Sequence, residues 1–344
     1  MSEERGLDYR SAGVDLEQAE RTKEGLRALV DSTRDEHTLS GLGLFGGLYE
    51  VPPGHRAPVL VSSADGVGTK LKVAFRTGRH DTVGQDLVNH CVNDILVQGA
   101  RPLFFLDYLA TGRLESSVAE AVVRGVALAC RENQCALLGG ETAEMPDFYA
   151  ADEYDLAGFI VGIVERDRIL DGSRVQEGDR LVALGASGLH TNGYTLARRI
   201  VFDRMGLDVE DPFPGEDATV GDVLLRVHRT YLSALLPDLG LDGLHALAHI
   251  TGGGMGGNLP RVLPEGLGAV VELASWEVPN LFRVLGSGGA VAPEEMRRVF
   301  NMGVGLVAVV DEGECGSFVE RLLERGEEAW VLGEVVEGSG VRFA

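Results

Sequence analysis

Cysteine, long apolar runs and basic charge are all scarce in this sequence of 344 residues. Its cysteines, Cys91, Cys130, Cys135 and Cys315, form neither a CxxC pair nor a cluster with zinc-ligand spacing, and so few suit a reducing compartment. No apolar run approaches the roughly 20 residues of a membrane span, and residues 1–20 lack the apolar core of a signal peptide. We therefore expect a cytoplasmic protein with no membrane partner.

Basic residues are fewer than acidic ones: the sequence has 31 basic and 53 acidic side chains, which give a formal net charge of −22. A field of that sign repels nucleic acid, so no nucleic-acid partner is expected. An anionic substrate would need local positive charge, backbone N–H groups or Mg²⁺ to offset the field. A solubility or salt adaptation explains the acidic excess equally well, and it carries no information about function.

The length and the order of elements predict two domains of α/β or α+β type. The first half is expected to contain helices at 17–31, 81–98 and 115–132 and strands at 58–64, 103–109, 135–138 and 155–165, the last at a sheet edge. The second half is expected to contain strands at 180–185, 268–273 and 303–310 and helices at 194–205, 220–238 and 315–325. Because the stretch 166–179 is polar, we place the boundary there, with domains of residues 1–168 and 169–344.

The loop DGVGTK at 65–70 follows an apolar strand. The Asp65 carboxylate suits Mg²⁺, which prefers oxygen ligands, and the two glycines let the backbone approach a ligand closely. Thr69 and Lys70 are suited to phosphate oxygens. The loop is not a Walker A motif, since GxxxxGK[ST] is absent, and an ordinary polar turn stays open as the alternative.

The predicted helix 81–98 carries short polar groups opposite its apolar stripe, namely Asp86, Asn89, His90 and Asn93, with Asp94 beside them. A solvated face normally carries Lys, Glu and Arg, so this face suits a metal or ligand site. The alternative is a face whose polar groups are hydrogen-bonded to neighbouring backbone.

Three further segments combine glycine with polar groups. In GGETAEMP (139–146), Glu141 and Glu144 follow a buried strand and suit Mg²⁺ or an amine, with a capped turn as the alternative. In the loop before the predicted helix 194–205, His190 is a candidate acid or base beside free helix N–H groups, which favour anions. The third segment, HITGGGMGGNLPRVLP at 249–264, predicts an ordered glycine loop.

Taken together and in this order, these segments resemble the phosphoribosylformylglycinamidine cyclo-ligases, also called aminoimidazole ribonucleotide synthetases. The resemblance covers nearly the whole chain, and its most specific strings are CVNDILVQGARPLFFLDY (91–108) and GGETAEMP (139–146). The other matching stretches are YRSAGVDL (9–16), DGVGTKLKVA (65–74), GDRLVALGASGLHTNGYTLAR (178–198), HITGGGMGGNLPRVLP (249–264) and FNMGVGL (300–306).

The resemblance implies a homodimer in which the N-terminal domains pair their sheets. It implies an ATP- and Mg²⁺-dependent ligase of the fifth step of purine biosynthesis. Formylglycinamidine ribonucleotide and ATP would give aminoimidazole ribonucleotide, ADP and phosphate through an iminophosphate. The N-terminal domain would bind ATP and Mg²⁺, and the C-terminal domain would bind substrate and phosphate.

The same resemblance implies site residues by position. The catalytic residues would be Lys23, Asp94, His190 and His249. The ATP and phosphate contacts would be Asp65, Gly66, Gly68, Thr69, Lys70, Asn93, Asp94, Gly139, Gly140 and Glu141. The substrate contacts would be Ser187, His190, Thr191, Asn192, Gly252, Gly253, Gly254 and Asn258, and the Mg²⁺ ligands would be Asp65, Asp94 and Glu141. Which histidine acts as acid or base stays open.

Two other readings compete. One is a related ATP enzyme, namely selenophosphate synthetase, thiamine-monophosphate kinase, the hydrogenase-maturation dehydratase or the far longer formylglycinamidine synthetase. Selenophosphate synthetase usually has a reactive cysteine or selenocysteine near its N-terminus, whereas the first cysteine here is Cys91. The other reading is a nucleotide-binding regulatory protein without turnover.

Overall fold

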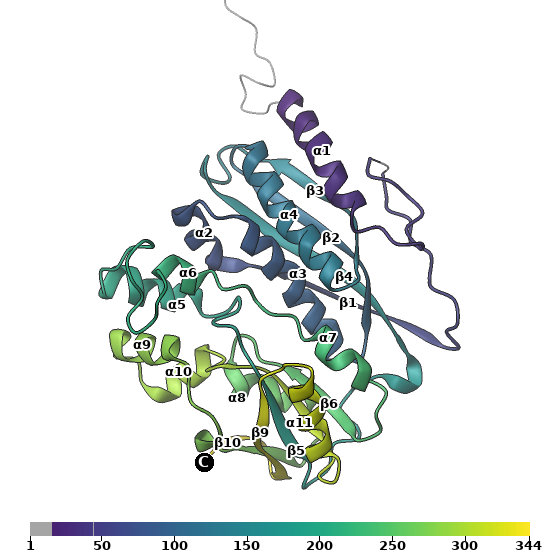
Figure 1. The fold of residues 1–344 in the computed structure, drawn as a ribbon, viewed down its shortest axis with the longest axis vertical. Helices are drawn as coiled ribbons and strands as arrows, with labels where there is room; N and C mark the ends of the chain where they lie inside the picture. Colours follow the sequence, from purple (N-terminus) through teal and green to yellow (C-terminus); the bar gives the residue numbers. More distant parts are fainter. Residues whose placement is uncertain (1–15, 44) are drawn as a thin grey trace, which may run out of the picture.

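The computed structural model describes residues 16–43 and 45–344, and these residues form two β-sheets with helices packed on them (Figure 1). The first sheet consists of β1 (Pro58–Gly66), β2 (Arg101–Thr111), β3 (Ala136–Glu144) and β4 (Tyr154–Glu165), in the order β1-β4-β2-β3. The prediction that 155–165 is an edge strand is wrong, because β4 pairs with β1 and β2 on its two sides. Its edge-like pattern arises because one face of the sheet is open and leaves Phe159 45% exposed.

Helices cover the other face of this sheet. They are α1 (Leu16–Asp31), α2 (Leu71–Thr77), α3 (Asp81–Leu96) and α4 (Ser116–Glu132). The three helices expected in this half are confirmed as α1, α3 and α4, whereas α2 was not expected. Helix α3 lies against β1, β2 and β4, and α4 packs on α3. The two helices approach closely at Gly84, where a Cβ atom would lie 2.1 Å from the carbonyl oxygen of Val122. This contact fixes α3, which carries much of the site described below.

The second sheet has six strands in the order β10-β7-β9-β5-β8-β6. They are β5 (Arg180–Gly185), β6 (Leu244–His249), β7 (Leu267–Val271), β8 (Val304–Val310), β9 (Ala329–Glu337) and β10 (Gly340–Phe343). The helices of this half are α5 (Tyr194–Arg198), continued by a π-helix at Arg199–Arg204, α6 (Val220–Leu224), α7 (Leu232–Leu235), α8 (Gly254–Asn258), α9 (Asn280–Gly289), α10 (Pro293–Val299) and α11 (Cys315–Glu324). The chain therefore has the expected mixed α/β architecture.

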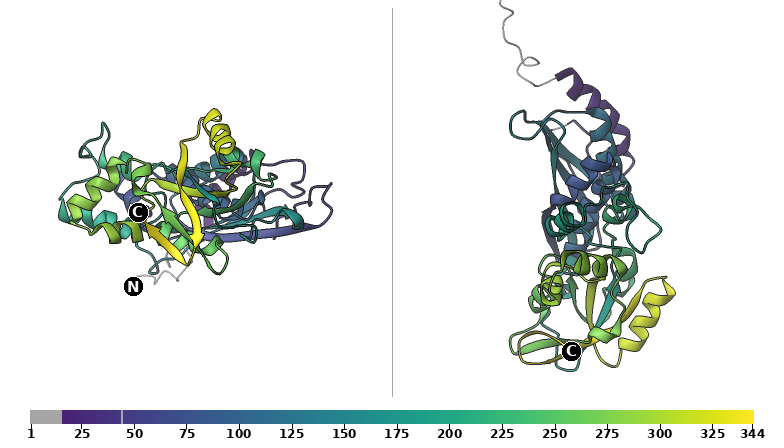
Figure 2. Two further views of the ribbon diagram at one scale, coloured as in Figure 1. Left: turned by 90° about the horizontal axis from the view of Figure 1, so that it is seen from below. Right: turned by 90° about the vertical axis from the view of Figure 1, so that its left-hand side faces the viewer.

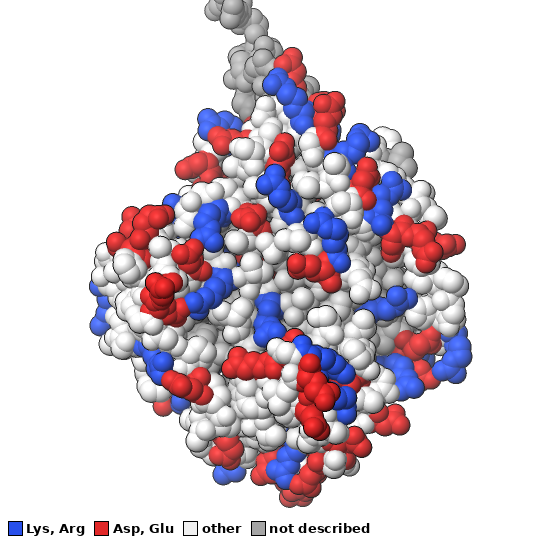
Figure 3. Space-filling view, viewed as in Figure 1, with Lys and Arg blue, Asp and Glu red and all other residues white. Residues whose placement is uncertain are grey.

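The two sheets lie one beyond the other along the long axis of the molecule (Figure 2). The strands of the first sheet end at Glu165 and those of the second begin at Arg180. The exact division at 168/169 stays a prediction. On the face seen in Figure 3, acidic and basic side chains of the described residues are interspersed. Among the described residues, no helix is both long and apolar enough to cross a bilayer.

The predicted helix 220–238 is wrong in its middle, because residues 225–231 leave the helical path between α6 and α7. Their backbone groups bond instead to side chains of α3. Asn89 Nδ2 donates to the His228 carbonyl oxygen (2.7 Å), and the His228 N–H donates to Asp86 Oδ1 (2.7 Å). The amide of Asn93 pairs with this segment too, accepting from the Tyr231 N–H at 3.0 Å. Much of the polar face of α3 therefore holds the two halves together.

Candidate active site

A cavity of about 490 Å³ opens where the two halves meet. Its volume lies within the usual range for small-molecule sites. The lining residues are Ser63, Asp65, His90, Asp94, Val97, Gln98, Ile169, Leu170, Asp171, Leu247, Ala248, His249, Thr251, Asn258, Arg261 and Val262. Four residues expected in the site from the sequence line this cavity, namely Asp65, Asp94, His249 and Asn258.

Two carboxylates face the cavity from neighbouring elements, Asp65 at the end of β1 and Asp94 in the last turn of α3. Asp65 Oδ2 lies 3.0 Å from His90 Nε2. Asp94 accepts a hydrogen bond from Ser63 Oγ (2.9 Å), and its other oxygen lies 2.9 Å from His249 Nδ1. The site therefore joins carboxylates of the first half to a histidine at the end of β6 in the second half.

Both carboxylates are held in the ionised form. Burial works to raise the pKa of Asp65, but the hydrogen bond and charge of His90 outweigh it, so the pKa of Asp65 is lowered. For Asp94 the opposing group is His249, and the pKa of Asp94 is likewise lowered. The side chains are 45% and 25% exposed, so both can be reached from the cavity. Two ionised, accessible carboxylates fit the oxygen-ligand preference of Mg²⁺.

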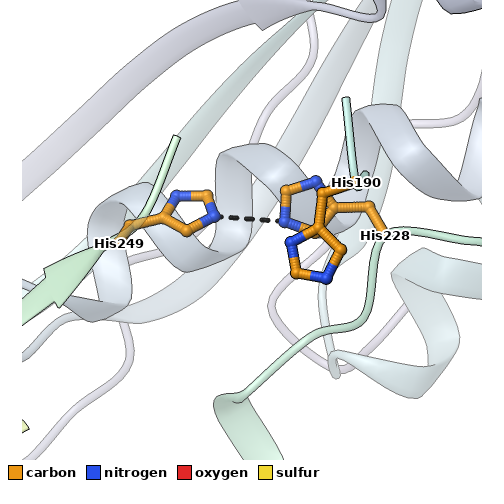
Figure 4. Close-up of side chains that lie close together, drawn as sticks. All are labelled: His190, His228 and His249. Atoms are coloured by element: carbon orange, nitrogen blue, oxygen red, sulfur yellow. Dashed lines mark hydrogen bonds between the residues drawn. The ribbon is translucent and has the colours of Figure 1, made fainter. Parts of the chain in front are cut away.

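Four histidines form a buried cluster beside these carboxylates. His90, His190, His228 and His249 are between 0% and 6% exposed. The rings of His190 and His228 stack with centroids 4.0 Å apart, and His228 Nε2 lies 3.1 Å from His249 Nε2 (Figure 4). Thr191 Oγ1 joins the cluster, at 2.7 Å from His90 Nδ1 and 3.3 Å from His228 Nδ1.

The histidines differ in how readily they take up a proton. Burial, reinforced by the charges of neighbouring rings, lowers the pKa of His190 and of His228 well below the usual value. Burial also lowers the pKa of His249, although its hydrogen bond with Asp94 opposes the shift. His90 is the exception. Burial works to lower its pKa, but the hydrogen bond to Asp65 and the charge of Asp94 outweigh it and raise the pKa of His90.

The loop residues expected to contact substrate surround this cluster. His190 has a left-handed backbone, φ +60°, which is uncommon for a non-glycine residue and often marks functional sites. Ser187 Oγ donates to the Val227 carbonyl oxygen at 2.6 Å, and Gly252 lies beside Asn192. Asn258 Nδ2 donates to the carbonyl oxygens of Gly252 (3.2 Å) and Gly254 (2.8 Å), so Asn258 also holds the glycine loop 252–254 in place.

Lys70 does not lie where it can contact phosphate in this structure. The side chain is fully buried and forms an ion pair of 2.7 Å with Asp86. Its ammonium group also donates to the carbonyl oxygens of Arg226 (2.7 Å) and His190 (3.2 Å), so its three hydrogens are all used. Lys70 thus ties the DGVGTK loop to the second half of the chain.

Asn93 is occupied in a similar way. Its amide oxygen accepts from Tyr231, and its nitrogen donates to the Arg229 carbonyl oxygen at 2.9 Å and lies 3.2 Å from His228 Nε2. The alternative of a polar face bonded to neighbouring backbone therefore describes Asp86, Asn89 and Asn93, while His90 and Asp94 face the cavity.

Of the DGVGTK loop, Asp65 alone lines the cavity. The Gly66 N–H donates to Asp65 Oδ1 at 2.6 Å. Gly68 has φ +63°, a left-handed turn that favours glycine and leads into the short helix Gly68–Lys70. Thr69 Oγ1 lies 3.0 Å from Thr195 Oγ1 and so joins the loop to α5.

Within one chain, Glu141 lies far from Asp65 and Asp94. The strand register runs from Gly66 on β1 through Ala157 and Tyr108 to Glu141 on β3. Three strand spacings separate β1 from β3, which is about 14 Å. Because neighbouring residues of a strand point to opposite faces, Glu141 and Asp65 also face opposite sides of the sheet.

Gly139, Gly140 and Lys23 are also outside the cavity. The two glycines lie on β3 beside Glu141. Lys23 lies on the exposed side of α1, where its ammonium group is 2.9 Å from Glu20 Oε1. The catalytic role expected for Lys23 stays a prediction.

Ser63, His90 and His228 are among the residues of this site that the sequence did not place in the expected set. His90 lay on the polar face of α3 and was visible as a candidate. His228 was hidden because the segment around it was expected to be helical, although a histidine between two arginines in an apolar stretch (Arg226–Arg229) is an unusual pattern for a buried helix.

Comparisons with known proteins support one family. Residues 21–164 match the N-terminal domain, and residues 176–344 the C-terminal domain, of the AIR synthase related proteins. A phosphoribosylformylglycinamidine cyclo-ligase of Sorangium cellulosum (strain So ce56) is 55% identical over 98% of this chain and 97% of its own length.

Solved structures with lower identity share the fold. A thiamine-monophosphate kinase of Stenotrophomonas maltophilia K279a has a TM-score of 0.69 at 19% identity, covering 93% of this chain and 95% of its own. The hydrogenase maturation protein HypE in complex with ATP has a TM-score of 0.65 at 20% identity, covering 93% and 86%. The domain matches and the full-length relative show that the chain belongs to the phosphoribosylformylglycinamidine cyclo-ligase family.

Proposed function

We propose that this chain converts formylglycinamidine ribonucleotide and ATP to aminoimidazole ribonucleotide, ADP and phosphate. The observation that carries the proposal is the 55% identity with a phosphoribosylformylglycinamidine cyclo-ligase over 98% of the chain. ATP phosphorylates the formyl oxygen to make an iminophosphate, since an amide oxygen is a poor leaving group. The neighbouring nitrogen then attacks that carbon, phosphate leaves, and a proton is released as the imidazole ring closes.

Asp65 and Asp94 are the residues of this chain that would hold Mg²⁺ beside the nucleotide. Both carboxylates are ionised and line one cavity. Bound Mg²⁺ would neutralise phosphate charge as it develops during transfer. Because Glu141 lies on a distant strand and faces the other side of the sheet, the proposal for this chain rests on the two aspartates alone.

The second half would bind and orient the substrate. His249 reaches the cavity from the end of β6, and His190 with Asn192 lies in the loop beside it. The pKa of His249 is lowered by burial, so His249 is neutral near pH 7 and able to accept a proton. Asp94 orients its ring through the hydrogen bond of 2.9 Å to Nδ1, which leaves Nε2 as the accepting atom.

A homodimer is part of the proposal. The open face of the first sheet carries apolar side chains, and Leu60 is 60% exposed and Phe159 45% exposed. Such a face is unusual for a sheet that stands alone. A second copy packed on it would bury both residues. A cytoplasmic location likewise stays a prediction from the sequence.

The test is a coupled assay of aminoimidazole formation with and without ATP. We expect one ADP and one phosphate per aminoimidazole, and neither product without formylglycinamidine ribonucleotide. ATP binding with no turnover in the presence of both substrates would instead support a regulatory nucleotide-binding protein. Transfer of phosphate to thiamine monophosphate would support the related kinase.

A further inference from the structure

Three of the four clustered histidines converge on one point. His190, His228 and His249 come from three separate segments, and they are 1%, 0% and 6% exposed. One ring nitrogen of each lies within 4.8 Å of the others. Figure 4 shows one ring nitrogen of His190 on the side from which His249 approaches His228.

The hydrogen bonds around His228 and His249 turn two lone pairs toward each other. Asp94 accepts a hydrogen bond from the His249 Nδ1–H group, so Nε2 of a neutral His249 ring is an acceptor. Asn93 uses its oxygen for the Tyr231 N–H and directs its NH₂ group at His228 Nε2 (3.2 Å), so this nitrogen is also an acceptor. With this arrangement of protons the two acceptors are only 3.1 Å apart, so either a proton or a metal ion must lie between them.

The spacing of the His228 and His249 nitrogens fits two ligands of a tetrahedral transition metal, and the His190 nitrogen lies within 4.8 Å of them. Zinc binds histidine nitrogen at about 2.0–2.1 Å, so two nitrogens at a tetrahedral angle are about 3.3 Å apart. The distance between His228 Nε2 and His249 Nε2, 3.1 Å, is close to that value. His190 Nδ1 is buried and has no hydrogen-bond partner, so it is free to provide a third ligand.

The outer nitrogens of the three rings also have partners. His249 Nδ1 bonds to Asp94 at 2.9 Å, as in the carboxylate–histidine–metal arrangements that fix a ligand ring. His228 Nδ1 lies 3.3 Å from the Thr191 hydroxyl. His190 Nε2 accepts a hydrogen bond of 3.3 Å from the Ser187 N–H. Binding a metal through Nδ1 would move the ring proton to Nε2 and so lose only this long contact.

We propose that His190, His228 and His249 form a three-histidine site for a zinc-like divalent transition metal, with a fourth position open. The site is separate from the proposed Mg²⁺ site, because its ligands are imidazole nitrogens and those of the Mg²⁺ site are carboxylate oxygens. One consequence rests on the proposed function. His190 and His249 are placed there on the substrate side, so bound zinc would inhibit the cyclo-ligase reaction.

The test uses the full-length, untagged protein incubated with Zn²⁺ or Co²⁺ and then desalted. We expect one metal ion per chain by elemental analysis, and for Co²⁺ the intense visible absorption of a four-coordinate site. His228→Gln and His190→Gln should each weaken zinc binding by more than the roughly 10–100-fold that outer-shell changes cost. His80→Gln is the matched control, because His80 contacts Tyr154 and lies outside the cluster.

The outcomes separate this inference from the proposed function. Absence of stoichiometric zinc and of the Co²⁺ spectrum in the wild-type protein overturns the site, whether or not the protein makes aminoimidazole ribonucleotide. Zinc binding that both glutamine variants retain places the metal elsewhere and also overturns it. Zinc binding with no cyclo-ligase activity supports the site and refutes the function. The wild-type Co²⁺ spectrum decides the matter if a variant does not fold.

Discussion

The neutral, buried His228 makes a prediction about stability and pH. Its pKa is well below 6.5 in the folded chain, because burial first and the neighbouring histidines second disfavour the charged form. In the unfolded chain the pKa returns to about 6.5. Below that pH the unfolded state binds a proton that the folded state does not, so the free energy of unfolding falls as pH falls.

The magnitude follows from proton linkage. A histidine that titrates only in the unfolded state lowers the free energy of unfolding by about 1.6 kcal/mol between pH 6.5 and 5, with a limiting slope of about 1.4 kcal/mol per pH unit. His190 and His249 act in the same direction, since burial lowers the pKa of each. The pKa of His90 is raised, so its contribution is fully present below pH 6.5 and is lost only at higher pH.

The perturbation is His228→Gln, and the assay is urea unfolding followed by tryptophan fluorescence at about pH 6.5 and pH 5. Between these two pH values, the free energy of unfolding of the variant should fall by about 1.6 kcal/mol less than that of the wild type. Asn133→Ala is the control, because it removes buried hydrogen bonds to Asn89 and to the Ala129 carbonyl oxygen without touching a titrating group, and its loss of unfolding free energy across the interval should match that of the wild type. An unchanged pH dependence in His228→Gln would refute the reasoning.

Three other substitutions test other parts of the structure. Lys70→Met should destabilise the chain by about 3–5 kcal/mol in urea, because it leaves the Asp86 carboxylate buried and unpaired. The double variant Lys70→Met/Asp86→Leu should recover much of the lost free energy of unfolding. An equal loss in the single and the double variant would contradict the ion pair. Asp94→Asn should keep the fold by circular dichroism but lower kcat by at least about 100-fold, and near-normal turnover would contradict its role. Phe159→Asp should shift the protein from dimer to monomer in light scattering, and an unchanged mass would contradict the dimer face.

The spacing of apolar residues along the sequence predicts those helices and strands that pack on a core close to them in the chain. Helix α3 shows this, because its apolar stripe packs on the sheet directly beneath it. The loop at Asp65 was also foreseen, since an apolar strand that runs into a carboxylate and two glycines is a local signal. The carboxylates Asp65 and Asp94 do line one cavity with His249.

Long-range partners explain what the sequence did not reveal. Asn89 and the His228 carbonyl oxygen are 139 residues apart, so nothing local shows that residues 225–231 leave a helix to bond with α3. For Lys70, the pattern of a basic residue after a glycine turn predicted phosphate binding. The structure instead pairs it with Asp86, because a fully buried ammonium group requires a nearby carboxylate.

The cavity carries a net negative charge, as the whole chain does. This charge determines how an anionic nucleotide can bind. The acidic lining residues of the cavity are Asp65, Asp94 and Asp171, and its basic ones are Arg261 and His90, whose pKa is raised. Lys70 contributes no net charge, because Asp86 neutralises it. ATP alone would therefore meet repulsion, whereas its Mg²⁺ complex brings the missing positive charge. We expect calorimetry to show ATP affinity at least about tenfold lower in EDTA than with Mg²⁺, a difference of about 1.4 kcal/mol. Equal affinity under both conditions would mean that protein cations outside this cavity neutralise the phosphates.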